Sequence, residues 1–175
     1  MSSVTRVIYS GRVITLTQEL VTLPNQQSCE LEIIHHPGGV AMVALDAQLN
    51  CCLLRQYRHA AGGWLWELPA GKLEKEEAPA TTAARELAEE AGMHAQEFIY
   101  LGRTISSPGV FTEIIHLYLA QGLSPIAQNH QSDEVIEVHW FPLTTIREWI
   151  AQGTIYDAKT IVGITLLDAY LQGKK

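Results

Sequence analysis

Short runs of alternating apolar and polar residues occupy the first part of the chain, and turn-forming residues separate them. Residues 6–9, 12–21 and 28–35 are rich in β-branched and large apolar side chains, whereas Gly11 and Pro24 fall between the runs. Runs of this kind, divided by turns, predict three strands. Consecutive strands with short connections pair readily as an antiparallel β meander.

The pattern that follows predicts a larger, mixed unit. Residues 40–45 are apolar at every position, which favours a central strand that is buried on both faces. Strands are predicted over residues 51–57, 99–103, 113–121 and 134–140, and a short strand or extended loop over 64–69. Helices are predicted over residues 79–91, 143–152 and 158–171. Strands on either side of one helix, followed by two helices, favour a mixed α/β or α+β sandwich.

The helix predicted over 79–91 has clear boundaries. Pro79 suits the first helical turn, where its missing N–H costs nothing, and Gly92 suits the position just past the helix end. An apolar stripe is predicted at Ala80, Ala83, Ala84, Leu87 and Ala91. Because most of this stripe is alanine, we expect the helix to pack closely against a sheet.

Three glutamates are predicted on the same helix, away from that stripe. Glu86, Glu89 and Glu90 stand at i, i+3 and i+4 and share one patch. A divalent cation would relieve their mutual repulsion, and all-oxygen ligands select Mg²⁺, Ca²⁺ or Mn²⁺ over zinc. The spacing alone also fits a solvated acidic face paired with Arg85. The choice between a metal site and a solvated face therefore depends on the surrounding residues.

Composition narrows the classes of function. The chain has 175 residues, of which 47% are hydrophobic and 18% charged, which suits one folded domain with a small appended element. The formal net charge is −7, with 12 Lys and Arg against 19 Asp and Glu. This balance argues against a nucleic-acid partner. An anionic substrate would therefore need local arginines or bound cations.

Cysteine usage and the N-terminus favour a cytoplasmic location. Cys29, Cys51 and Cys52 form no disulfide framework and are expected to be reduced. The first residues lack a basic region followed by an apolar stretch, and no apolar run reaches the length of about 20 residues that a membrane helix needs. We therefore expect no membrane partner.

The residues around the glutamates form a longer motif with fixed spacing. Nine positions over 71–93 match one pattern: Gly71, Glu77, Arg85, Glu86, Leu87, Glu89, Glu90, Gly92 and Met93. This segment resembles the complete Nudix box. The resemblance implies a Nudix pyrophosphohydrolase with an α/β/α sandwich over 39–175, preceded by the β meander over 1–38.

The resemblance also implies a metal site and a role for each box residue. The cofactor would be Mg²⁺, with Mn²⁺ as a possible substitute. Its ligands would be the carboxylates of Glu86, Glu89 and Glu90 and the carbonyl of Ala70. Arg85 would orient the glutamates and Glu77 would be structural. Gly71 would permit a tight turn and close backbone approach.

Further segments resemble one branch of the Nudix hydrolases, the ADP-ribose pyrophosphatases. They are RQYR at 55–58, WELPAG at 66–71, SPG at 107–109, HPG at 36–38 and DAKT at 157–160. The implied reaction is hydrolysis of ADP-ribose to AMP and ribose 5-phosphate. GDP-mannose hydrolases share much of this layout and remain the alternative. Thr112 departs from the branch pattern, which puts some substrate contacts in doubt.

Substrate contacts are implied for Arg55, Arg58, Trp66, Glu67, Pro108 and Glu113. Strand alternation places Arg55 and Arg58 on opposite faces, so a regular strand cannot point both into one pocket. We favour Arg58, which is near the strand end. A solvated arginine pair and a core role for Trp66 remain open.

The general base is expected in the acidic segment over 128–137. Glu134 matches the resemblance best, with Asp133 and Glu137 as alternatives, and only geometry can decide between them.

The N-terminal meander resembles the element through which the branch forms homodimers. A lone meander has little core, so pairing in a C2 dimer would bury its apolar side chains. A Nudix module that binds ADP-ribose without turnover is a further alternative, although all three glutamates are present.

Overall fold

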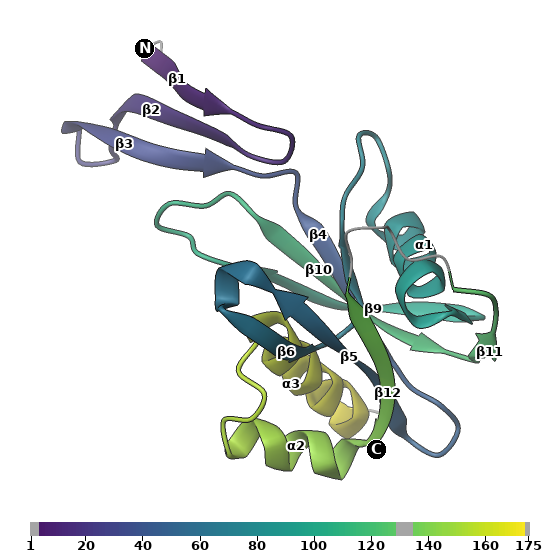
Figure 1. The fold of residues 1–175 in the computed structure, drawn as a ribbon. Coiled ribbons are helices and arrows are strands. Elements are labelled where there is room, and N and C mark those ends of the chain that lie inside the picture. Colours follow the sequence, from purple (N-terminus) through teal and green to yellow (C-terminus); the bar gives the residue numbers. More distant parts are fainter. Residues whose placement is uncertain (1–3, 129–134, 174–175) are drawn as a thin grey trace.

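The computed structural model describes residues 4–128 and 135–173, and its N-terminal sheet projects away from the rest of the chain (Figure 1). This sheet contains β1 (Val4–Ser10), β2 (Thr15–Thr22) and β3 (Ser28–His35), paired in that order and antiparallel. The predicted meander is confirmed. Its second strand begins later than expected, because residues 11–14 form the turn in which Gly11 N–H donates to the Ile14 carbonyl at 2.9 Å.

The main body has two principal sheets. In the first, the strand order is β7 (Ala70–Lys72), β4 (Gly39–Ala44), β10 (Ile114–Gln121) and β9 (Glu97–Ile105). Strands β4 and β10 run parallel and the other pairs run antiparallel, so the expected mixed sheet is present.

The second sheet is wholly antiparallel, with β5 (Asn50–Arg58) between β12 (Ile136–Pro142) and β6 (Gly63–Glu67). A 3₁₀ turn, η1 (His59–Ala61), joins β5 to β6, and β8 (Met93–His94) pairs with β11 (Ser124–Pro125). The two sheets meet at an isolated bridge between Leu45 and Cys51. The central layer is therefore split, which strand patterns alone do not indicate.

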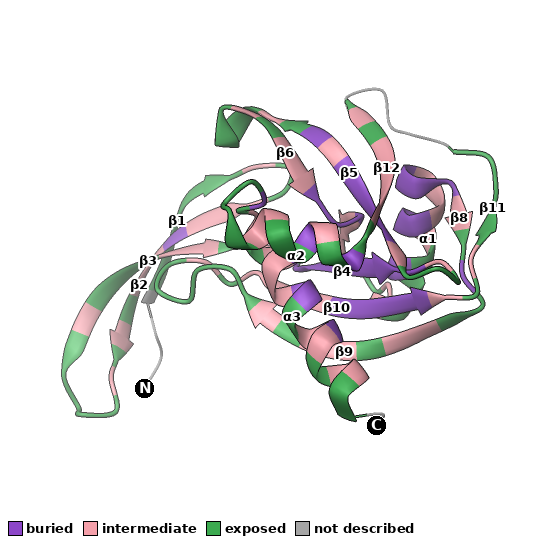
Figure 2. Ribbon diagram, turned by 90° about the horizontal axis from the view of Figure 1, so that it is seen from below, coloured by how far each residue is buried: buried purple, intermediate pink, exposed green. Residues whose placement is uncertain are grey.

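Helices cover both faces of this layer, which confirms the sandwich. Helix α1 (Pro79–Ala91) lies on one side, and α2 (Leu143–Ala151) and α3 (Ala158–Gly173) lie on the other (Figures 1 and 2). Val40 and Met42 of β4 pack in the cluster with α1, whereas Ala41 and Val43 pack in the cluster with α2 and α3. Strand β4 is therefore buried on both faces, as predicted.

The apolar stripe predicted for α1 is only partly correct. Ala83, Leu87 and Ala91 are buried in the sheet-facing cluster, but Ala80 and Ala84 are exposed. The buried face is instead widened on the side of β7 by Thr82, Glu86 and Glu90. The glutamates therefore do not form a solvated face: Glu86 is 6% exposed and Glu90 is 2% exposed.

Beyond the chain connection, Ile34 ties the meander to the body. Ile34 forms a parallel bridge with Phe111, in which Ile34 N–H donates to the Val110 carbonyl and Thr112 N–H donates to the Ile34 carbonyl. The sheet therefore joins the loop between β9 and β10. In the described part of the chain, every helix is too short or too polar to cross a bilayer.

Candidate active site

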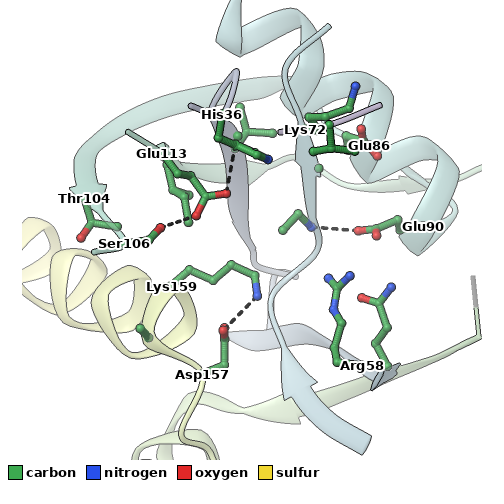
Figure 3. A pocket seen from close by; sticks show the side chains of 18 of the residues that line it. His36, Arg58, Lys72, Glu86, Glu90, Thr104, Ser106, Glu113, Asp157 and Lys159 are labelled. Atoms are coloured by element: carbon green, nitrogen blue, oxygen red, sulfur yellow. Dashed lines mark hydrogen bonds and ion pairs between the residues drawn. The ribbon is translucent and has the colours of Figure 1, made fainter. Parts of the chain in front are cut away.

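A cavity of about 870 Å³ lies among α1, β7, the end of β5 and the start of α3 (Figure 3). The hairpin between β1 and β2 also reaches it through Arg12 and Val13. Its charged lining residues are Arg12, Arg58, Lys72, Glu74, Arg85, Glu86, Glu90, Glu113, Asp157 and Lys159. Acidic and basic groups therefore face one space that is large enough for a nucleotide-sized ligand.

Glu90 contacts the backbone of β7 directly. The Ala70 N–H donates to Glu90 Oε2 at 2.8 Å. Ala70 lies opposite Ala41, and Met42 N–H bonds the Pro69 carbonyl at 2.9 Å. Ala41 and Ala70 therefore form a non-hydrogen-bonded pair, in which both the N–H and the C=O of Ala70 point away from β4. The Ala70 carbonyl therefore projects on the same side of β7 as Glu90.

Gly71 allows Glu86 to occupy its position. A Cβ at residue 71 would lie 1.9 Å from Glu86 Cδ and 2.1 Å from Glu86 Oε1. Its backbone is in the ordinary negative-φ region. The glycine is therefore required for close approach of a carboxylate rather than for a turn.

Arg85 orders the acidic residues. Its Nη1 donates to Glu86 at 2.8 Å and to Glu89 at 3.3 Å. Its Nε and Nη2 donate to the two oxygens of Glu77 at 3.2 and 3.0 Å. The hydrogen bonds from Arg85 lower the pKa of Glu77, and Thr82 adds a further hydrogen bond.

The oxygen atoms at this wall suit a hard divalent cation as ligands. Two buried carboxylates and a peptide carbonyl supply only oxygen ligands, as Mg²⁺ and Mn²⁺ prefer. Buried carboxylates are costly unless a cation accompanies them. In the ranges 4–128 and 135–173, no three Asp, Glu, His or Cys side chains are already gathered around one point. Arg85 forms ion pairs with both Glu86 and Glu89.

A second group of charges lies across the cavity and is centred on Glu67. This side chain is 1% exposed and does not line the cavity itself. Arg58 Nε and Nη2 donate to its two oxygens at 3.0 and 3.1 Å, and Lys159 Nζ donates to Oε2. Glu67 therefore holds two cavity-lining cations from behind.

The pKa of Glu67 reflects two opposing effects. Burial raises this pKa, but the hydrogen bonds and charges of Arg58 and Lys159 outweigh burial and hold it below the ordinary value. The carboxylate is therefore charged at neutral pH and the ion pairs are formed.

Asp157 links this group to α3. Its Oδ2 accepts hydrogen bonds from the Thr160 N–H at 3.0 Å and from Thr160 Oγ at 2.6 Å, as an N-capping residue does. Its Oδ1 accepts from Lys159 Nζ at 3.0 Å. Thr160 Oγ in turn accepts from the Leu68 N–H at 2.9 Å. The first turn of α3 is thereby fixed to the strand that carries Glu67.

Glu113 forms another part of the wall. It accepts a hydrogen bond from Ser106, and its Oε1 lies 3.4 Å from His36 Nδ1 (Figure 3). Gly38 N–H donates to the same His36 nitrogen at 3.0 Å. Burial lowers the pKa of His36, and the nearby Glu113 opposes this effect.

Four predicted contact residues lie outside the cavity wall: Glu67, which is buried behind the wall, and Trp66, Arg55 and Pro108. Trp66 packs against Phe141 and Trp149, with ring centroids 5.4 Å from each, so it belongs to the core. Arg55 points to the other face of β5, where it pairs with Glu137 at 3.1 Å. Pro108 is in the adjacent loop and does not line the cavity.

The three candidates for the general base are Glu134, Asp133 and Glu137. Glu134 and Asp133 lie outside the described residues. Glu137 is on β12 and is paired with Arg55, away from the cavity.

Sequence reasoning gave no role to Lys159, Asp157 or Arg12. The capping signal was visible, since Asp157 stands directly before the helix predicted over 158–171, where Asp suits the N-cap. The link from Lys159 to Glu67 spans 92 residues and has no local signal.

Comparisons with known proteins give consistent matches over most of the chain. A family model described as NUDIX domain matches residues 35–161. The "Methanol dehydrogenase activator" of Bacillus methanolicus is 40% identical over 93% of this chain and 89% of that protein. The "ADP-ribose pyrophosphatase" of Bacillus subtilis (strain 168) is 38% identical over 91% of this chain and 88% of that protein. A solved structure of an "ADP compounds hydrolase" has a TM-score of 0.83 at 19% identity and covers 97% of this chain and 92% of that chain, which shows a shared fold.

The first prediction concerns Gly71. Gly71→Ala would place a methyl group on the Glu86 carboxylate, so Glu86 must move and the acidic wall is disrupted. We expect hydrolytic activity to fall by roughly 10²-fold, as displacement of a reacting group by about 1 Å does. Gly173→Ala is the control, since nothing lies within 4 Å of its added Cβ. Equal activity of both variants would contradict this account of Gly71.

The second prediction concerns pH and Glu67. Its folded-state pKa is lowered, so its stabilising contribution is complete above the unfolded pKa near 4.5 and is lost as pH falls through the folded value. At pH 7, Glu67→Gln should lower the free energy of unfolding by about 3–5 kcal/mol, because it leaves buried cations unpaired. Urea unfolding from pH 7 to pH 3 should show this difference shrinking. A difference that stays constant with pH would argue against the ion pairs.

Proposed function

This chain belongs to the NUDIX domain family and is a Nudix hydrolase, and we propose that its substrate is ADP-ribose, cleaved at the diphosphate to AMP and ribose 5-phosphate. One observation supports this most directly. Buried carboxylates on α1 and two cations held by Glu67 face each other across a single cavity. That arrangement suits a ligand with a charged diphosphate centre.

The choice of ADP-ribose is supported by sequence similarity. A relative named ADP-ribose pyrophosphatase is 38% identical over most of both chains. The chain also has the branch segments at 66–71 and 107–109.

We propose Mg²⁺ as the metal, held by Glu86, Glu89, Glu90 and the Ala70 carbonyl. When bound, the cation would neutralise charge on the diphosphate and lower the pKa of a nearby water. Arg85 keeps Glu86 and Glu89 oriented, and Gly71 leaves room for Glu86.

The remaining residues have binding and proton-transfer roles. The outer edge of Arg58 is available to bind phosphate oxygens, because its other edge is taken by Glu67. Glu113 lines the part of the cavity nearest the loop at 107–109 and would contact the sugar. Glu134 remains our proposed general base, because it matches the resemblance best; of its two alternatives, Glu137 is held by Arg55 on another face and Asp133 stays open.

We also propose that the protein is a homodimer paired through its meander. The strand register puts Val7 and Leu31 on one face of that sheet and Tyr9 and Leu20 on the other, and all four are exposed. A sheet with exposed apolar groups on both faces is a natural pairing surface. The free thiols at Cys29, Cys51 and Cys52 suit a reducing compartment, so we propose a cytoplasmic location.

The third prediction tests the reaction. With Mg²⁺, AMP should form faster from ADP-ribose than equivalent products form from GDP-mannose, ADP-glucose or NADH, and chelator should abolish the activity. Glu90→Gln should reduce the rate by roughly 10²-fold or more, since even outer groups around a metal matter by 10- to 100-fold. Glu97→Gln, at an exposed site on β9, is the matched control.

Faster turnover of GDP-mannose than of ADP-ribose would identify GDP-mannose as the substrate. Tight binding of ADP-ribose without turnover of any compound would show a binding module instead.

The fourth prediction tests the dimer. Val7→Glu combined with Leu31→Glu should convert a dimer to a monomer in light scattering coupled to gel filtration, because charge replaces apolar groups at the pairing surface. Leu49→Glu alters an equally exposed apolar residue in the β4–β5 turn and should leave the mass unchanged. A monomeric parent protein would contradict the proposal.

A further inference from the structure

We propose that Lys159 is a phosphate-binding residue, which acts with Arg58 as a cation pair that the buried carboxylate of Glu67 aligns. This inference rests on the proposed function, because it names the groups that would hold the phosphates of that substrate. Figure 3 shows Lys159 and Arg58 in the lower half of the view, with His36, Lys72 and Glu86 in the upper half.

The donors of Lys159 are only partly used within the protein. An ammonium group has three N–H donors. Lys159 gives one to Glu67 and one to Asp157. The side chain lines the cavity although it is only 13% exposed. The third donor is therefore available to an anion in the cavity.

Arg58 presents a complementary edge. Its Nε and one Nη2 donor bind Glu67, so that edge of the guanidinium is saturated. The Nη1 donors and the second Nη2 donor point away from Glu67, since a guanidinium is planar and its fork is rigid. The side chain is 42% exposed and lines the cavity. Two parallel hydrogen bonds to phosphate suit this edge.

Glu67 fixes the relation between the two cations. Arg58 and Lys159 both bind this one carboxylate, so their charged groups are held beside each other. Without it, two like charges so close would repel each other. Because Glu67 is buried behind them, both cations face the cavity, with Asp157 beside Lys159. Glu67 is therefore a positioning residue that need not touch the substrate.

A purely structural role for Lys159 would predict a different set of effects. The ion pairs with Glu67 and Asp157 would then stabilise only the start of α3. Stability would change on mutation, but affinity for phosphate compounds in the folded protein would not.

The test is calorimetric titration of the full chain with inorganic diphosphate, AMP and ribose 5-phosphate, each with Mg²⁺. Lys159→Met keeps the apolar stem and removes the charge. We expect affinity for at least one probe to fall roughly ten- to a hundredfold, the worth of a hydrogen bond from a charged donor. Comparison of AMP with ribose 5-phosphate shows which half of the substrate Lys159 contacts. Lys75→Met, at an exposed position outside the cavity lining, should bind all three as the parent does.

Two further variants keep the test decisive. Lys159→Arg retains a charged donor and should recover much of the lost affinity even if Lys159→Met folds poorly. In a Glu67→Gln background, Lys159→Met should have a smaller effect than in the parent, because alignment has already been lost.

Unchanged affinity of folded Lys159→Met for every probe would overturn the proposal, as would a parent protein that binds none of them. Lys159-dependent binding together with no hydrolysis of ADP-ribose would uphold this inference while refuting the proposed substrate.

Discussion

The close approach of α1 to β7 is the constraint on which the rest of the site depends. Glu86 occupies the space that a side chain at Gly71 would fill, and Glu90 accepts the Ala70 N–H. Two carboxylates are thereby buried beside a peptide carbonyl, with Arg85 in contact with one of them. A helix with larger side chains than alanine at the sheet-facing position 83 could not lie so near the sheet.

The close approach of α1 to β7 matters chemically because it places buried carboxylates opposite the two cations that Glu67 holds. The acidic side is built on one helix and its adjoining strand, whereas the basic side is assembled from β5, β6 and α3 through Glu67. Each side is held by buried groups rather than by solvent-exposed ion pairs, which would contribute little. Both are therefore fixed before a ligand arrives, which reduces the cost of ordering them on binding.

Local patterns predicted the main strands, the helices and the acidic motif, but not the short strands β7, β8 and β11 or the environment of that motif. The spacing of Glu86 and Glu90 places both on one patch, yet it cannot distinguish a solvated face from a buried one. That distinction depends on β7, which has three residues and no periodicity of its own. Trp66 illustrates the same limit, since only its contacts with Phe141 and Trp149 identify it as a core residue. Lys159 bonds Glu67, which lies on a strand 92 residues away in the sequence, so no local pattern indicates the pair.

Asp157 restricts how the protein can diversify. The same carboxylate caps the start of α3 and positions the cavity-lining Lys159. A substitution of Asp157 therefore changes the helix cap and the lysine together. Change on this side would lower helix stability together with ligand recognition. Thr112 and its neighbours in the loop between β9 and β10 are not bound by such a double role in helix formation. Evolution of new sugar preferences is therefore expected to proceed through that loop, while the start of α3 is retained.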